Sequence, residues 1–364
     1  MATQGSVWIH GNIHFVDNET DKMNSERNES VFNSYSRRKN VLKVAVTDGT
    51  TEIARSFVYR IFTDNVFGEN QSVFVSFYEL PEKATFMESV MMELTSFSPN
   101  LLNGISYSNN ASVEFKNADV VICIGVAREY DFKSEELSEL FFEEHVRVSK
   151  FYGEAIEKYV KRDAKIIVLG NTTATIISKY ATSIPSENIT TLSLINLNIA
   201  AAQIAARAQC LATEVKNIII WGSNGSHSFP DCRYTYLTSG KTLSDSLKVW
   251  IRNVLPHTIR NVSNRPAHIR SIAYALAEHC KILWNGTPEK EWTSMGVMSD
   301  HSYNVRAGIF FSYPVYCQNG QYEIVQDLDH DRYIKKYISD LNVLIYREID
   351  VALKLCDLIP YSDP

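Results

Sequence analysis

The 364-residue sequence lacks three features that would assign it to a broad class of protein. No segment concentrates Lys and Arg, and the formal net charge is -6, so no basic stripe is present to neutralise nucleic-acid phosphates. No run approaches the roughly 18 apolar residues that a membrane span needs. The first residues also lack the basic and then apolar pattern of a secretion signal. We therefore expect a cytoplasmic protein that binds neither nucleic acid nor membranes.

Paired cysteines are also missing. None of the six cysteines has a neighbour at the spacing of a metal-binding or redox motif, and they are scattered as Cys123, Cys210, Cys232, Cys280, Cys317 and Cys356. This pattern favours buried or idle thiols in a reducing compartment. The sequence predicts no metal site.

The composition that is present, 45% hydrophobic and 21% charged, is typical of a globular protein with room for two domains. Residues 18–40 are almost purely polar, a composition that cannot bury enough apolar surface to become ordered. Short apolar bursts before them, from Ser6 to Val16, could form a strand. We treat residues 1–40 as a mostly disordered N-terminal arm.

From residue 41 onward, short apolar runs alternate with amphipathic stretches. The runs at 42–46, 73–80, 118–126 and 164–171 have the length of strands buried on both faces, and helix-like stretches separate them at 53–62, 86–94 and 134–162. This alternation predicts an α/β fold, with a Rossmann-type doubly wound parallel sheet over residues 41–190.

The second half of the chain has a different pattern. An Ala-rich helical stretch at 193–215 precedes a strand-like run at 217–223, and residues 241–284 are largely helical. Residues 310–325 predict a hairpin that turns at Asn319-Gly320, and the last thirty residues predict an amphipathic helix. We interpret residues 191–364 as an α+β domain.

Several segments, in order and with few insertions between them, resemble cytosolic malate dehydrogenase of the lactate/malate dehydrogenase superfamily, from about residue 42 to 350. They are VFG (66–68), VMMEL (90–94), VKNIIIWGS (215–223) with Phe229-Pro230-Asp231, NGTPEKEWTSMGVMSD (285–300) and FFSYPV (310–315). The resemblance implies a Rossmann-type NAD domain, a lactate/malate dehydrogenase-like C-terminal domain and a homodimer. It also implies a small 2-hydroxy or 2-oxo acid as substrate.

The family's reaction needs a histidine base, because a neutral imidazole takes the hydroxyl proton of malate as hydride leaves. The resemblance places that base at Asn224, whose amide cannot accept the proton. His227, three residues later, is a possible substitute, although a solvated loop histidine is the simpler reading. The aspartate that orients the base in the family is replaced by Asn196, for which a buried, hydrogen-bonded amide is the simpler reading.

The resemblance also assigns positions that bind substrate. Ile199 replaces the arginine that would clamp a carboxylate. In the mobile loop, Arg128 matches one family arginine and Lys133 offers a point charge near the other, although an ordinary surface Arg/Lys pair is an equal alternative. Asn171 keeps the family's amide that faces substrate and cofactor.

The dinucleotide loop departs from the family's glycine pattern. The chain reads Thr47-Asp48-Gly49-Thr50-Thr51-Glu52-Ile53, in which Gly49 is the single glycine. We expect Asp48 and Glu52 to favour helix capping and to repel a pyrophosphate from this helix N-terminus. Glu79 retains the acid that would bind the adenosine ribose, unless it is simply a solvated strand end, and Gly125 is also retained. NAD is thus the cofactor that the resemblance implies, with its binding weakened.

These losses predict a divergent malate dehydrogenase paralogue that is catalytically weak or inactive. Losing the base and its orienting acid would cost several powers of ten in rate. One alternative is an active NAD-dependent oxidoreductase in which His227, Arg128 and Lys133 rebuild the site. Another is a regulatory dimer partner of a true malate dehydrogenase.

Overall fold

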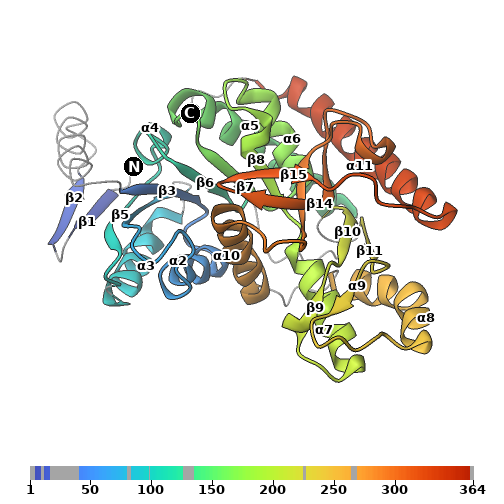
Figure 1. The fold of residues 1–364 in the computed structure, drawn as a ribbon. Coiled ribbons are helices and arrows are strands. Elements are labelled where there is room, and N and C mark those ends of the chain that lie inside the picture. Colours follow the sequence, from blue (N-terminus) through green and yellow to red (C-terminus); the bar gives the residue numbers. More distant parts are fainter. Residues whose placement is uncertain are drawn as a thin grey trace.

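The computed structural model describes residues 5–9, 12–16, 41–79, 83–97, 99–125, 135–223, 227–263 and 269–360. Within these ranges, a 13-stranded sheet runs through the molecule, and helices cover both of its faces (Figure 1). No helix of the described part is long and apolar enough to cross a membrane. The six cysteines are free thiols, and Cys210 alone among them is not buried.

The centre of the sheet consists of six parallel strands. They are β3 (Leu42–Thr47), β4 (Val73–Tyr78), β5 (Leu102–Ser108), β6 (Val120–Cys123), β7 (Lys165–Val168) and β8 (Ile189–Leu192). Their spatial order is β8-β7-β6-β3-β4-β5, so the chain starts in the middle, builds one side and then crosses over to the other. This is the doubly wound Rossmann order that the alternating pattern predicted, with its switch point between β3 and β6.

Two helical layers enclose these strands. Neighbouring residues of a strand face opposite sides of the sheet, so an apolar strand needs a helical layer on each side. Val44 and Val46 of β3 join the core beneath α2 (Glu52–Thr63), α3 (Ala84–Phe97) and α10 (Ile269–Asn285). Ala45 faces the other core, beneath α4 (Ala111–Glu114), α5 (Glu135–Tyr159) and α6 (Asn171–Tyr180). Figure 1 shows α4, α5 and α6 on one side of the sheet and α2, α3 and α10 on the other.

The C-terminal strands extend this same sheet and do not form a separate one. Met295 and Gly296 pair with Leu192 and Thr191 in an antiparallel register, so that the second half of the chain continues from the edge of β8. The added strands are β13 (Thr293–Met298), β14 (Phe310–Gln318), β15 (Gln321–Ile324), β10 (Ile219–Gly222) and β11 (Ser228–Asp231). A two-stranded sheet of β9 (Val215–Lys216) and β12 (Tyr236–Leu237) lies apart from them.

The remaining helices include α7 (Leu194–Ala208), α8 (Asp245–Asn253), α9 (Leu255–Ser263) and α11 (Arg332–Leu358), together with short 3-10 turns at Ser186–Asn188, Ala212–Glu214 and Ser302–Asn304. The predicted hairpin is confirmed, because Asn319 and Gly320 both have positive φ, at 53° and 74°, as a tight two-residue turn requires. The predicted amphipathic C-terminal helix is α11, which buries one face that includes Ile338, Ile345 and Ala352.

At the opposite edge, the N-terminal segment forms two strands, β1 (Gly5–Ile9) and β2 (Asn12–Val16). They make an antiparallel hairpin, and β1 pairs with β5, where Trp8 lies opposite Ile105. The apolar segment between Ser6 and Val16 thus extends the sheet by pairing with β5. The sequence did not indicate this partner strand. The predicted disordered stretch 18–40 lies outside the described residues.

Candidate functional site

The loop between β3 and α2 is the position at which the fold would receive a dinucleotide phosphate. The helix begins with Thr51 as its N-cap, whose hydroxyl accepts a hydrogen bond from the Ala54 amide at 3.2 Å and donates one to the Asp48 carbonyl at 2.8 Å. Ile53 is buried in the core beneath the helix. Glu52 lies in the first turn, with one carboxylate oxygen 3.2 Å from the Arg270 guanidinium. A neutral threonine therefore caps this helix.

Asp48 does not cap the helix, contrary to the expectation from sequence. Its backbone is left-handed, with φ of 56°, and its side chain turns inward, where 3% of the residue remains exposed. The carboxylate accepts hydrogen bonds from the Thr47 hydroxyl at 2.6 Å and the Tyr152 hydroxyl at 3.1 Å. Burial, together with the neighbouring charge of Glu79, raises the pKa of Asp48 to about 6. Asp48 thus places beneath the phosphate loop a buried carboxyl group whose ionisation is unfavourable.

Glu79, at the end of β4, contacts the same loop from its other side. Its side chain is fully buried, and one carboxylate oxygen accepts hydrogen bonds from the Thr50 amide at 2.9 Å and the Thr50 hydroxyl at 2.7 Å. Lys83 approaches the other oxygen at 4.0 Å. The acid that the resemblance assigns to ribose therefore binds the loop that the resemblance assigns to phosphate.

Gly49 shows how closely this loop is packed. A Cβ atom added there would lie 2.7 Å from the Phe77 ring and 2.9 Å from the Met87 side chain, below any normal contact distance. The position therefore needs a glycine, although it is out of register with the glycines of the family's motif. With Thr50 N–H occupied, Gly49 packed against Phe77 and Asp48 beneath, the loop does not fit the pyrophosphate of a dinucleotide.

Asn171 lies at the start of α6, where β7 ends, and joins three strands. Its buried amide donates hydrogen bonds to the carbonyls of Gly222 and Phe310 at 3.0 and 3.1 Å. Its amide oxygen accepts the Thr191 hydroxyl at 2.6 Å. These bonds connect β8, β10 and β14. Both N–H donors of the amide that was predicted to face substrate are therefore hydrogen-bonded to backbone carbonyls.

Two of the substituted catalytic positions lie on α7. The fully buried Asn196 donates its amide N–H to the Ser228 hydroxyl at 2.8 Å, whereas a carboxylate at this position would accept hydrogen bonds. Ile199 is half-buried and packs against two apolar clusters. Neither side chain supplies the negative or positive charge that the family's reaction needs here.

A histidine and a carboxylate that are distant in sequence come together beside Asn171. His227 Nδ1 lies 3.4 Å from a carboxylate oxygen of Glu348 on α11, and the other oxygen of Glu348 accepts the Thr172 hydroxyl at 2.5 Å. The hydrogen bond to Glu348 raises the pKa of His227, and the nearby charge of Arg260 opposes that rise. About 40% of each side chain is exposed, so an aqueous proton can reach the pair.

Backbone contacts at the ends of β10 and β11 fix the position of His227. Gly222 has φ of 102°, and a Cβ atom there would lie 2.3 Å from the His227 carbonyl oxygen. The Ser223 amide donates to that same oxygen at 2.8 Å. Sequence reasoning singled out His227 but missed Glu348, because no spacing rule connects residues 121 positions apart.

Three predicted site residues lie outside the described part of the chain: Asn224, Arg128 and Lys133. Gly125 is described and has φ of 77°. Its nearest neighbour is the ring of His145, which would lie 3.7 Å from a Cβ atom at that position. His145 contacts the Thr173 hydroxyl at 2.7 Å, and burial lowers its pKa. Among the described residues, no group of three His, Cys, Asp or Glu side chains is placed to hold a metal ion.

Comparisons with known proteins agree with the fold and extend it. Residues 190–350 match the family model of the lactate/malate dehydrogenase alpha/beta C-terminal domain. The cytoplasmic malate dehydrogenase of Taenia solium is 33% identical over 329 residues, which cover 86% of this chain and 98% of that protein. The human cytoplasmic malate dehydrogenase is 32% identical over 303 residues, which cover 79% of this chain and 90% of that protein.

Solved structures show the same architecture. Malate dehydrogenase from Naegleria fowleri superposes with a TM-score of 0.79 at 27% identity, covering 86% of this chain and 98% of that one. Lactate dehydrogenase from Trichomonas vaginalis, in complex with NADH and oxamate, superposes with a TM-score of 0.78 at 20% identity, covering 88% of this chain and all of that one. With the sequence identity extending over most of its length, the chain belongs to the malate dehydrogenase family, as a divergent member.

Proposed function

We propose that this protein has lost the malate-oxaloacetate reaction of its family, or keeps a trace of it, and acts in the cytoplasm as a homodimeric binding or structural protein. The observation that carries the proposal is the dinucleotide loop. Glu79 occupies the Thr50 amide, while Asp48 lies buried beneath the loop. A pyrophosphate would have to displace the Glu79 carboxylate from the Thr50 amide and then lie close to the Asp48 carboxylate. Each of these negative charges opposes the binding of an anion.

The substituted acid–base residues support the same proposal independently. A positioned general base contributes about 10²–10⁴ in rate, and Asn224 cannot supply that contribution. Asn196 donates its amide to Ser228, so it cannot stabilise an imidazolium as a carboxylate would. Ile199 cannot form the two parallel hydrogen bonds of an arginine to a substrate carboxylate.

The proposal is tested by titrating NADH into the purified protein while its fluorescence is followed, and then adding oxaloacetate and following reduced-nicotinamide absorbance. We expect no saturable binding up to millimolar NADH and no turnover above background. Tight binding with turnover would refute the proposal. Saturable binding without turnover would refute the argument from the loop and leave the argument from the missing base.

The His227–Glu348 contact favours a second candidate, an NAD-dependent oxidoreductase with a rebuilt site. A histidine held by a carboxylate is the pairing that acid–base chemistry uses, and Arg260 adds a positive charge near it. A panel of 2-oxo acids with NADH tests this candidate. If any reductase activity is found, His227→Asn should lower it by about a hundredfold or more, and an unchanged rate would eliminate His227 as the base.

The third candidate, a regulatory subunit, differs in the oligomer that it predicts. A partner of a true malate dehydrogenase would form mixed dimers when the two chains are expressed together. Sedimentation of the co-expressed chains distinguishes mixed dimers from the homodimer that we propose.

A further inference from the structure

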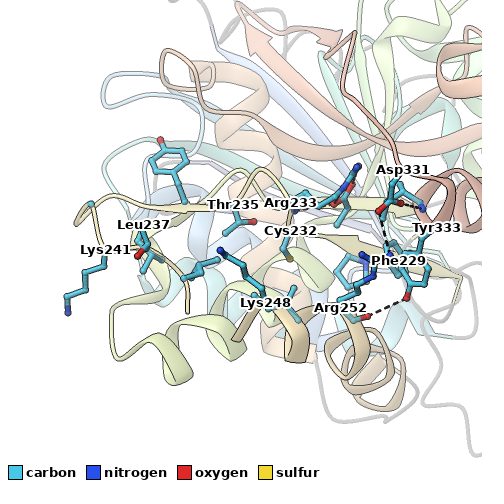
Figure 2. Close-up of a pocket in the computed structure, with 18 residues that line it drawn as sticks. Phe229, Cys232, Arg233, Thr235, Leu237, Lys241, Lys248, Arg252, Asp331 and Tyr333 are labelled. Carbon is cyan, nitrogen blue, oxygen red and sulfur yellow. Dashed lines mark hydrogen bonds and ion pairs between the residues drawn. The ribbon is translucent and has the colours of Figure 1, made fainter. Parts of the chain in front are cut away.

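A groove of about 640 Å³ lies between β11, the segment after it, α8 and the start of α11. Figure 2 shows Lys241 and Leu237 toward one end of this groove, and Arg252, Tyr333 and Asp331 toward the other. We call it the β11–α8 groove. Its volume falls within the range of pockets that enclose small organic ligands, about 300–1,000 Å³. None of the residues discussed at the dinucleotide loop or beside Asn171 lines it.

The interior of the β11–α8 groove is mainly apolar. Phe229, Leu237, Leu243 and Ile251 line it, and all of them except Leu243 are buried. Phe229 is held in place by stacking on the Tyr337 ring, with 4.3 Å between the ring centroids. Fixed apolar walls of this kind favour an alkyl or aryl group by removing its surface from water.

The polar groups inside the groove are either neutral or paired with each other. Burial raises the pKa of the Cys232 thiol to about 12, so this thiol remains neutral, and the Thr235 hydroxyl lies beside it. Asp231 is buried, and its carboxylate is held by the Arg233 guanidinium through hydrogen bonds of 2.9 and 2.8 Å. This pair is satisfied internally, so neither member is available to a ligand without leaving the other charge unpaired.

The remaining charges around the groove are mostly positive, although the whole chain carries -6. Arg252 lies over the Tyr333 ring at 4.4 Å and 3.6 Å from Asp331. Lys248 contacts Asp245, whose side chain is 97% exposed, at 3.1 Å, a type of pair worth little against solvent. Lys241 is exposed and makes no ion pair with any residue that the structure describes.

We propose that the β11–α8 groove binds a small organic acid with an apolar body, whose carboxylate is attracted by the positive charges of Lys248 and, at the end of the groove, Lys241. The apolar floor binds the alkyl or aryl part, and the two lysines provide the charge that discriminates an acid from its neutral analogue. A nucleotide fits less well, because Arg233 and Arg252, whose planar forks suit phosphate, already contact Asp231 and Asp331. A purely apolar ligand would leave the lysines without a role.

The probe for this proposal is 1-anilinonaphthalene-8-sulfonate, an aryl anion that fluoresces in apolar sites, followed by its displacement with decanoate. We expect saturable binding at one site per chain, displacement by decanoate, and at least tenfold weaker displacement by the neutral decanol. Shortening the acid should weaken displacement by about fourfold for each methylene removed.

Variants test the position of the site. Lys241→Gln combined with Lys248→Gln should weaken decanoate about tenfold or more and leave decanol unchanged. Both lysines are exposed, so the variant should remain folded, which circular dichroism verifies. Lys290→Gln combined with Lys354→Gln removes the same charge from two other exposed lysines, with side chains 87% and 74% exposed, and should change nothing.

Three results would overturn the proposal. The first is the absence of saturable probe binding. The second is equal affinity for decanoate and decanol, because the lysines would then contribute nothing. The third is an equal loss of decanoate affinity in both lysine variants, because the effect would then come from net charge alone. NADH titration in the presence of decanoate keeps this test separate from that of the proposed function.

Discussion

Asp48 offers a direct measurement of what the altered dinucleotide loop costs the fold. Its carboxyl is buried, and its pKa rises from 3.8 to about 6 in the folded chain. The native state therefore binds the proton more tightly than the unfolded state, so Asp48 costs the fold nothing below pH 3.8, and its cost grows as pH rises from 3.8 to about 6. Above that pH the ionised, buried group costs about 3 kcal/mol, at 1.36 kcal/mol for each pKa unit.

Replacing Asp48 with asparagine removes this cost. The amide oxygen can still accept hydrogen bonds from the Thr47 and Tyr152 hydroxyls. The new N–H donors are buried with too little water to complete their hydrogen bonds, and this offsets part of the gain. We therefore expect Asp48→Asn to stabilise the protein by about 2 kcal/mol at pH 7.5. Urea denaturation at several pH values provides the test. The difference from the parent protein should shrink as pH falls below 6 and vanish between pH 4 and pH 5, because Asp48 is then protonated in the folded chain and its ionisation costs little.

Asp340→Asn is a matched control for this experiment, because Asp340 is exposed on α11. It should change the free energy of unfolding by no more than about 0.5 kcal/mol at any pH. The argument fails if Asp48→Asn is destabilising at pH 7.5. It also fails if the stabilisation is the same at pH 4 and pH 7.5, because titration of the buried carboxyl would not then be its cause.

Two further substitutions test other contacts. Glu348→Gln should lower the pKa of His227, which proton NMR of the imidazole measures. In the parent protein the raised pKa contributes stability that is complete below pH 6.5 and is lost as pH rises through the folded pKa; an unchanged titration would rule out the contact. Gly49→Ala should cost about 1–3 kcal/mol in thermal or urea unfolding, because its Cβ atom would lie 2.7 Å from Phe77. Gly170→Ala is its contrast, because nothing lies within 4 Å of a Cβ atom there, and equal effects would contradict the packing argument.

The centre of the fold could be predicted from sequence because its signal is local. The apolar runs at 42–46 and 164–171 became β3 and β7, since a strand buried on both faces must be apolar throughout. The pairing of β8 with β13 and of β1 with β5 could not be predicted, because it joins segments roughly a hundred residues apart. Pairing over such separations depends on where the rest of the chain has already placed each edge.

The candidate site, like the fold, was only partly predictable from the sequence. The substitutions at Asn196 and Ile199 can be read directly, because an amide and an alkyl group cannot replace a carboxylate and a guanidinium whatever the geometry. The direction of the Asp48 side chain could not be read, because it depends on the left-handed backbone at that residue and on Tyr152, which lies 104 positions away. The use of Glu79 to hold the Thr50 amide depends likewise on the loop's path and not on either residue type.

The substituted positions explain how the fold persists without the family's catalytic residues. Asn196 finds a partner in Ser228, and Ile199 adds apolar contact to two clusters. Glu79 satisfies an amide that a phosphate would otherwise bind. The two replaced residues and the retained Glu79 thus all interact with other parts of the chain. These positions are therefore stabilised by contacts within the chain, and the shared fold does not by itself imply the family's chemistry.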